Sequence, residues 1–152
     1  MEMSGCIRSA RMEDSGRLSE IEVINYRLNF YPIFRNDSYY FDELQVLTLA
    51  QEYHEHPRLI EQTLVYDDGI VKGFIRIDKQ EVKKLFVEHA FQNSGIGAAL
   101  LGFAVAEQGV CHLWALEKNT KAIAFYKRCG FSDSGERKAV EDTPEYLIHL
   151  IR

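Results

Sequence analysis

Hydrophobic and polar positions follow two periods along the chain, and the changes of period divide it into helices and strands. Apolar residues at i, i+3 and i+4 are typical of a helix with one buried face, whereas short runs of β-branched and aromatic residues indicate strands. The predicted helices follow Ser15 and cover about residues 37–55, 96–104 and 119–129. The predicted strands cover about residues 5–10, 63–66, 70–77, 81–87, 110–116, 131–138 and 145–151.

The order of these elements predicts the fold class. Hairpins come first, and helices alternate with strands later, which is typical of an α/β fold with a mixed, largely antiparallel sheet. We expect about six to seven strands flanked by about four helices. The 152 residues, 46% of them hydrophobic, are enough for one core and too few for two, so we predict a single domain over residues 1–152.

An aromatic stretch separates the first two predicted helices. Residues 25–40 contain six Tyr and Phe residues and are interrupted by Pro32, which predicts an aromatic loop or short helices. We expect the following helix to stop before Pro57, because the residue before a proline is pushed out of the α region.

Composition and charge remove several classes of function. A formal charge of −5 argues against sequence-independent binding of nucleic acid, which depends on Lys and Arg. No apolar run approaches the about 20 residues of a membrane-spanning helix, so we expect a cytoplasmic protein that does not act in a membrane. The three cysteines lack the spacing of zinc ligands, and His54 and His56 have no third ligand near them in sequence, so we expect no metal.

A glycine-rich segment follows the strand predicted at 81–87 and opens a helix. Its sequence is Gln92-Asn-Ser-Gly-Ile-Gly-Ala98. Unpaired N–H groups at a helix start attract anions, and glycines let phosphate oxygens approach the main chain. The segment therefore predicts a phosphate-binding loop.

Three other interpretations of this loop compete. It is not a Walker loop, because no Gly-Lys-Ser or Gly-Lys-Thr occurs. A dinucleotide fingerprint requires a third glycine where Leu100 stands, although Glu117 lies about 20 residues further on, where that motif has an acid. A glycine-rich connection that binds nothing is the remaining interpretation.

A second segment makes the comparison more specific. Its sequence is Asn119-Thr-Lys-Ala-Ile-Ala-Phe-Tyr-Lys-Arg-Cys-Gly-Phe131. The glycine loop resembles the Q/R-x-x-G-x-G/A signature of GNAT N-acetyltransferases, and the second segment resembles the N-x-x-A-x-x-F-Y-x-x-x-G-F signature of the same family. The resemblance covers about the last 90 residues closely and the first 60 only in outline.

The resemblance implies a GNAT fold, whose sheet is splayed in the middle to admit acetyl-CoA. The main chain of the strand would bind the pantetheine arm and the acyl carbonyl, and the glycine loop would hold the pyrophosphate. Asn119 would contact the pantetheine arm, and Phe125 would pack beside it. The implied cofactor-binding residues are Leu85, Phe86, Val87, Gln92, Asn93, Ser94, Gly95, Ile96, Gly97, Ala98, Asn119, Phe125 and Tyr126.

The resemblance also implies two catalytic roles. Tyr126 would be the general acid that protonates the departing CoA thiolate, since a phenol can deliver the proton that the sulfur needs. Glu81, four residues before Leu85, is the first candidate for the base that deprotonates the amine, with His89 and His112 as alternatives. The spacing of these residues along the chain does not by itself establish either role. Tyr126 also fits a core position, and Glu81 fits an exposed strand start.

The function that these features predict is N-acetyl transfer from acetyl-CoA to a primary amine of a small molecule or peptide, by direct attack in a ternary complex. The alternatives are a CoA-binding sensor or scaffold without turnover, and a binder of another nucleotide. The sequence leaves the acceptor open among polyamines, amino acids, antibiotics, small amines and protein N-termini or lysines. A homodimer is possible because the family often forms one.

Overall fold

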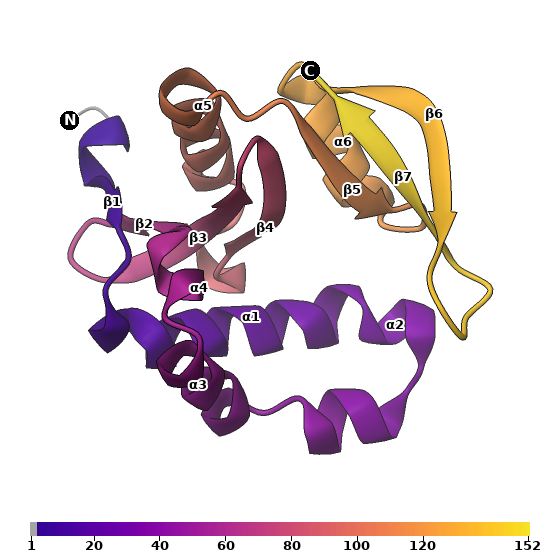
Figure 1. Cartoon of the computed structure of the whole chain (residues 1–152), viewed down its shortest axis with the longest axis horizontal. Coiled ribbons are helices and arrows are strands. Elements are labelled where there is room, and N and C mark those ends of the chain that lie inside the picture. Colours follow the sequence, from indigo (N-terminus) through magenta and orange to yellow (C-terminus); the bar gives the residue numbers. More distant parts are fainter. Residues whose placement is uncertain (1–2) are drawn as a thin grey trace.

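The computed structural model describes residues 3–152, which form one seven-stranded sheet with helices on both faces (Figure 1). The strand order is β1-β2-β3-β4-β5-β7-β6, and every neighbouring pair is antiparallel except β4 with β5. The strands are β1 (Ile7–Ser9), β2 (Thr63–Asp67), β3 (Val71–Asp78), β4 (Glu81–Val87), β5 (His112–Leu116), β6 (Ser132–Ala139) and β7 (Tyr146–Ile151). The mixed, largely antiparallel sheet that the sequence predicts is confirmed.

Six α-helices lie within residues 3–152, two of them single turns. They are α1 (Ser15–Asn29), α2 (Tyr31–Phe34), α3 (Val46–Glu55), α4 (Arg58–Glu61), α5 (Ile96–Gln108) and α6 (Thr120–Arg128). Short 3-10 turns occur at η1 (Met3–Cys6), η2 (Met12–Asp14) and η4 (His89–Phe91), and η3 (Tyr39–Glu43) is a π turn.

The helix predicted over 37–55 is interrupted, and the prediction of one continuous element there was wrong. After η3 the chain is extended at Leu44 and Gln45 before α3 begins. Leu44 is buried with Tyr40 against Val23 of α1, so tertiary packing overrides the local helical pattern. The strand predicted at 5–10 is likewise shorter, because η1 occupies its first residues.

Each face of the sheet has its own core. On one face α5 packs through Leu100, Leu101 and Ala104 against the centre of the sheet. On the other face Leu18 and Ile21 of α1, with Tyr53 of α3, pack on Val65 and Phe74. Two layers of helices therefore hold the sheet from opposite sides.

Strands β4 and β5 are paired at one end and separate at the other. Their parallel register contains Glu81 with His112 and Val82 with Leu113. Beyond these pairs β4 continues along β3 as far as Val87, and β5 continues along β7 as far as Leu116, so the two strands diverge (Figure 1). The splayed sheet that the sequence predicts is present, and we call this opening the β4–β5 splay.

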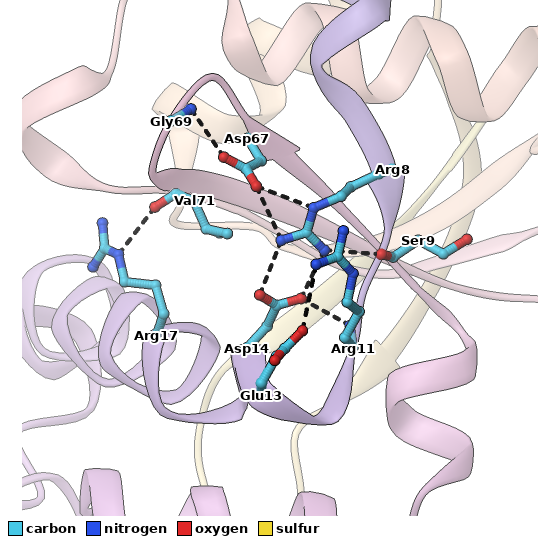
Figure 2. Close-up of polar contacts among 9 residues, drawn as sticks. All are labelled: Arg8, Ser9, Arg11, Glu13, Asp14, Arg17, Asp67, Gly69 and Val71. Atoms are coloured by element: carbon cyan, nitrogen blue, oxygen red, sulfur yellow. Dashed lines mark hydrogen bonds and ion pairs between the residues drawn. The ribbon is translucent and has the colours of Figure 1, made fainter.

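An ion-pair cluster ties the N-terminal strand to the first helix and to the hairpin of β2 and β3 (Figure 2). The Arg8 guanidinium donates to Asp14 at 2.9 and 3.0 Å and to Asp67 at 3.1 Å. Asp14 also accepts from the main-chain N–H of Arg11 at 2.8 Å, and this bond fixes the turn that leads into α1. The cluster sets the position of α1 on the sheet.

Candidate cofactor and acceptor site

The open edge of β4 presents main-chain groups from alternate residues. The N–H of Glu88 donates to the carbonyl of Lys72 at 2.8 Å, which makes these two residues a hydrogen-bonded pair. Bonded and non-bonded pairs alternate in an antiparallel ladder, so the pairs that β3 forms with Leu85 and Val87 are non-bonded. The main-chain groups of Leu85 and Val87 therefore point away from β3, toward the splay. The main-chain groups of Phe86 pair with β3. Of the three residues predicted to contact the cofactor through the main chain, only Leu85 and Val87 therefore face the splay.

The carbonyl of Val87 is already held by two side chains. Asn25 Nδ2 of α1 donates to it at 3.1 Å, and Gln92 Nε2 donates to it at 3.0 Å. Gln92 Nε2 also lies 3.3 Å from Asn25 Oδ1. These bonds fix the end of β4 and the start of the glycine loop, so the Gln92 side chain is used within the protein.

Sequence reasoning missed Asn25. The residue is buried, with 2% of its surface exposed, and its side chain crosses from α1 to β4. The signal was its spacing, because Asn25 lies four residues after Ile21 and seven after Leu18 on the same buried helix face. A polar residue in such a stripe needs a partner, and here the partner is a strand carbonyl beside the splay.

The start of α5 has the form of an anion cradle. Asn93 and Gly95 have positive φ angles of 62° and 90°, and Gly95 is the N-cap residue. The first helical hydrogen bond of this turn runs from the N–H of Ala99 to the carbonyl of Gly95, at 3.0 Å. The earlier N–H groups, those of Ile96, Gly97 and Ala98, have no intrahelical acceptor and lie at the positive end of the helix dipole.

Gly97 brings the two signature segments together. A Cβ at this position would lie 3.3 Å from Cζ of Phe125 and 3.7 Å from Cγ2 of Val87. The glycine therefore allows α5 to approach α6 and the end of β4 closely. Ile96 is buried in the core and Ser94 bonds back to the carbonyl of Phe91, so both can offer a ligand their main chain.

On α6, Asn119 and Tyr126 have clear local environments. Asn119 caps the helix, with Oδ1 accepting from the N–H of Ala122 at 3.4 Å. The Tyr126 ring packs edge-on against Phe125 and Phe131, at centroid distances of 5.3 and 6.0 Å. Burial raises the pKa of the Tyr126 phenol, which keeps it protonated at neutral pH. A protonated phenol is the form that a general acid requires.

Glu81 lies at the paired end of the splay. It is opposite His112 of β5, and its Oε2 is 3.4 Å from Nζ of Lys83. Four residues of strand separate it from Leu85, about 13 Å at the usual rise. The structure therefore places this predicted base well down β4 from the open main-chain groups.

Aromatic side chains cover the α1 side of the splay. The Tyr26 ring lies edge-on to Phe86 at 5.6 Å and to Phe30 at 4.9 Å. On the other side of the splay, Trp114 of β5 stacks on His149 of β7 at 4.6 Å, and His149 Nε2 is 3.0 Å from His112 Nδ1. His112, an alternative base, is thus part of an imidazole pair, whereas His89 lies in η4 beside the glycine loop.

These residues fit an acyl-CoA molecule. An extended pantetheine arm matches the main-chain groups of Leu85 and the N–H of Val87, which no neighbouring strand covers. A pyrophosphate matches the N–H groups at the start of α5, where Gly95 has a conformation that few other residues adopt. Within residues 3–152, by contrast, no group of three or more His, Cys, Asp or Glu side chains could hold a metal ion.

Comparison with known proteins identifies the class of this domain. Residues 60–133 match the acetyltransferase (GNAT) domain family. The peptidyl-lysine N-acetyltransferase YjaB of Salmonella typhimurium is 32% identical over 89 residues, which is 57% of this chain and 61% of that protein. The match thus spans less than two thirds of the relative's length.

Solved structures have the same fold. The apo form of YjaB from Escherichia coli has a TM-score of 0.75 at 22% identity, covering 95% of each chain. The paiA N-acetyltransferase of Thermoplasma acidophilum, solved with coenzyme A, has a TM-score of 0.68 at 18% identity and covers 96% of this chain and 98% of its own. The putative acetyltransferase yncA of Salmonella typhimurium, solved with acetyl-CoA, scores 0.63 at 18% identity and covers 95% and 90%.

The match over residues 60–133 confirms the resemblance to the GNAT acetyltransferase family that the two signature segments indicate. Acetyl-CoA, the cofactor expected from the sequence, is the acyl donor that this family uses. In the part of the chain that the structure describes, no helix is long and apolar enough to cross a membrane.

Proposed function

We propose that this protein is an N-acetyltransferase that transfers an acetyl group from acetyl-CoA to a primary amine by direct attack in a ternary complex. The observation that carries the proposal is the juxtaposition of two features: the open main-chain groups of Leu85 with the N–H of Val87, and the glycine-rich start of α5. The acceptor would be a small molecule or a peptide. The name of the Salmonella relative, a peptidyl-lysine N-acetyltransferase, supports the peptide option.

In this proposal the chain binds and orients its two substrates. Bound acetyl-CoA supplies the activated acyl group. The N–H groups from Asn93 to Ala98 hold the pyrophosphate, and the N–H of Leu85 or Val87 polarises the acyl carbonyl by hydrogen bonding. Phe125 packs beside the arm, with Asn119 close by at the start of α6.

Two proton transfers complete the reaction. The amine must lose a proton as its nitrogen bonds to the acyl carbon, and the sulfur must gain one as its bond to that carbon breaks. Tyr126 is the proposed donor to sulfur, supported by its place beside Phe125 in the second signature segment. Glu81 is the proposed acceptor of the amine proton, direct or through water, and its neighbour His112 is the alternative.

Calorimetric titration with acetyl-CoA and with NAD tests the cofactor assignment. We expect saturable binding of acetyl-CoA and none of NAD. The Gly97→Glu variant, which puts a carboxylate at the cradle, should lose the binding. Gly102→Glu on the same helix, where a side chain meets open space, should retain it.

Release of free CoA thiol in the presence of candidate amines tests the reaction. Turnover with any primary amine supports the transferase. Binding of acetyl-CoA without turnover across polyamines, amino acids, small amines and lysine peptides would favour a CoA-binding sensor or scaffold. No binding by a folded sample would overturn the proposal. Cytoplasmic location and dimerisation remain proposals, to be checked by cell fractionation and by sedimentation.

A further inference from the structure

A buried carboxylate on α1 has one oxygen without a partner. Glu22 is 3% exposed, and its Oε2 accepts from Nζ of Lys84 at 2.9 Å. Its other oxygen, Oε1, is buried and receives no hydrogen bond from any described residue. A buried carboxylate oxygen without a donor is costly, so its retention calls for an explanation.

The neighbouring cation does not satisfy this oxygen. Arg76 Nη1 lies 4.0 Å from Glu22 Oε1, which is an ion-pair distance but too long for a hydrogen bond. The rest of the guanidinium is engaged elsewhere: Nε donates to Thr63 Oγ1 at 3.0 Å, and Nη2 donates to the hydroxyl of Tyr53. Arg76 is therefore held in place with one nitrogen turned toward the unpartnered oxygen.

Glu22 and Arg76 border a cavity of about 270 Å³ on the α1–α3 side of the sheet. Its charged walls are Glu22, Glu52, Asp78, Arg76, Lys83 and Lys84, three acids and three bases. The cavity is thus formally neutral but carries both signs side by side. Such a wall suits a ligand that itself carries both charges, and a polycation gains less from it.

The cavity shares strand β4 with the splay, because Lys83 and Lys84 line it. Lys84, which binds Glu22, immediately precedes Leu85, and one turn beyond Glu22 the Tyr26 ring packs on Phe86. Helix α1 therefore lies along the same stretch of β4 whose main chain faces the splay. The cavity also extends toward the paired end of the splay, where its wall residue Asp78 pairs with Glu81.

We propose that this cavity binds the amine acceptor, and that the acceptor is a free amino acid or a closely related zwitterion. Its α-ammonium group binds at Glu22 Oε1, and its carboxylate binds on the side of Lys84 and Arg76 Nη1. The volume of about 270 Å³ suits a molecule of this size. This inference rests on the proposed acetyl transfer, and it names the substrate class of that site.

Direct binding and turnover together test the substrate class. The twenty standard L-amino acids, putrescine and an N-terminally blocked lysine peptide are titrated separately into the CoA-bound protein by calorimetry, where no turnover occurs, and thiol release from acetyl-CoA is followed with each in a separate assay. We expect at least one amino acid to bind saturably and to have a kcat/KM at least tenfold above those of putrescine and the peptide.

Two variants locate the binding. Glu22→Gln keeps the side-chain shape and should raise the KM and Kd for that amino acid at least tenfold, with the Kd for acetyl-CoA unchanged. Lys84→Gln should weaken the binding of the amino acid more than the binding of the corresponding amine that lacks the carboxylate. Glu107→Gln, an exposed change on α5, serves as the control for both.

The outcomes separate this inference from the proposed function. Failure to bind acetyl-CoA overturns both. Acetyl-CoA binding with no amino acid bound, with turnover confined to putrescine or the peptide, or with unchanged amino acid affinity in Glu22→Gln overturns the amino-acid assignment and leaves the transferase in place. Thermal unfolding of each variant verifies that it is folded before it is counted.

Discussion

The side-chain amide of Gln92 donates a hydrogen bond of 3.0 Å to the main-chain carbonyl of Val87. This bond joins the last residue of β4 to the first residue of the glycine signature. Asn25 donates to the same oxygen from α1, so three segments meet at one carbonyl. The Gln92 side chain therefore shapes the loop, and its main-chain neighbours remain available for a phosphate.

Removing this amide tests its positioning role. In Gln92→Ala we expect the Kd for acetyl-CoA to rise about five- to tenfold, equivalent to about 1 kcal/mol for one lost hydrogen bond. Gln108→Ala at the far end of α5 is the matched control. An unchanged Kd in Gln92→Ala, measured by calorimetry, would show that the loop holds its shape without the bond.

The two glycines of α5 should respond in opposite ways to alanine. At Gly102 a Cβ meets nothing within 4 Å, so Gly102→Ala should raise the free energy of unfolding by about 0.5–1 kcal/mol. At Gly97 the Cβ would press on Phe125, so Gly97→Ala should lose this gain and weaken acetyl-CoA binding. Urea denaturation and calorimetry on both variants make the comparison, and equal gains in stability would argue against close packing at Gly97.

Replacing the Tyr126 hydroxyl separates catalysis from packing. Tyr126→Phe keeps the ring contacts with Phe125 and Phe131, so acetyl-CoA binding should be unchanged. If the phenol is the general acid, kcat should fall about 10²- to 10⁴-fold. A fall of less than threefold in kcat would assign Tyr126 to the core.

The raised pKa of Tyr126 also predicts an alkaline loss of stability. Burial raises its pKa above the unfolded value of about 10, so the folded state favours the protonated phenol. Its contribution is complete below about pH 10 and declines as the pH rises toward the folded pKa. The free energy of unfolding should therefore drop less between pH 9 and 11 in Tyr126→Phe than in the wild type. Equal drops would contradict the shift.

The Arg8 cluster predicts the behaviour in acid. Burial of Asp14 opposes its ionisation, but the bonds from Arg8 and the Arg11 N–H outweigh it and lower its pKa. The N–H of Gly69 and the Arg8 guanidinium lower the pKa of Asp67. Because both folded pKa values are lowered, the stabilisation is complete above about pH 4 and is lost as the pH falls further.

Arg8→Met should accordingly cost about 1.5–3 kcal/mol of unfolding free energy at pH 7, and the difference from the wild type should shrink below pH 4. Arg11→Met removes the exposed pair with Glu13, 3.3 Å apart, and should cost less than about 1 kcal/mol. A pH-independent difference for Arg8→Met, measured by denaturant titration, would point to lost packing in place of lost charge.

Residue patterns predicted most of this fold because its motifs are local. The strand before Gln92, the glycine helix start and the helix that begins near Asn119 each depend on neighbours within a few residues, and all three were found. Asn25 and Glu22 were missed, because their partners Val87 and Lys84 are both 62 residues away. The break at Leu44 was missed for the same reason: it depends on contacts with Val23, which helical spacing does not encode.

The short pairing of β4 with β5 is a hinge about which the two halves of the sheet can move. Two residue pairs at one end join the strands β1–β4 to the strands β5–β7, and at the other end β4 and β5 do not pair. An acyl-CoA molecule lying in the splay would bond to the main-chain groups of β4 that no strand covers there. We therefore expect the sheet to be more flexible about Val82 and Leu113 in the free protein than in the protein with acetyl-CoA bound. The acyl donor would then also stabilise the sheet.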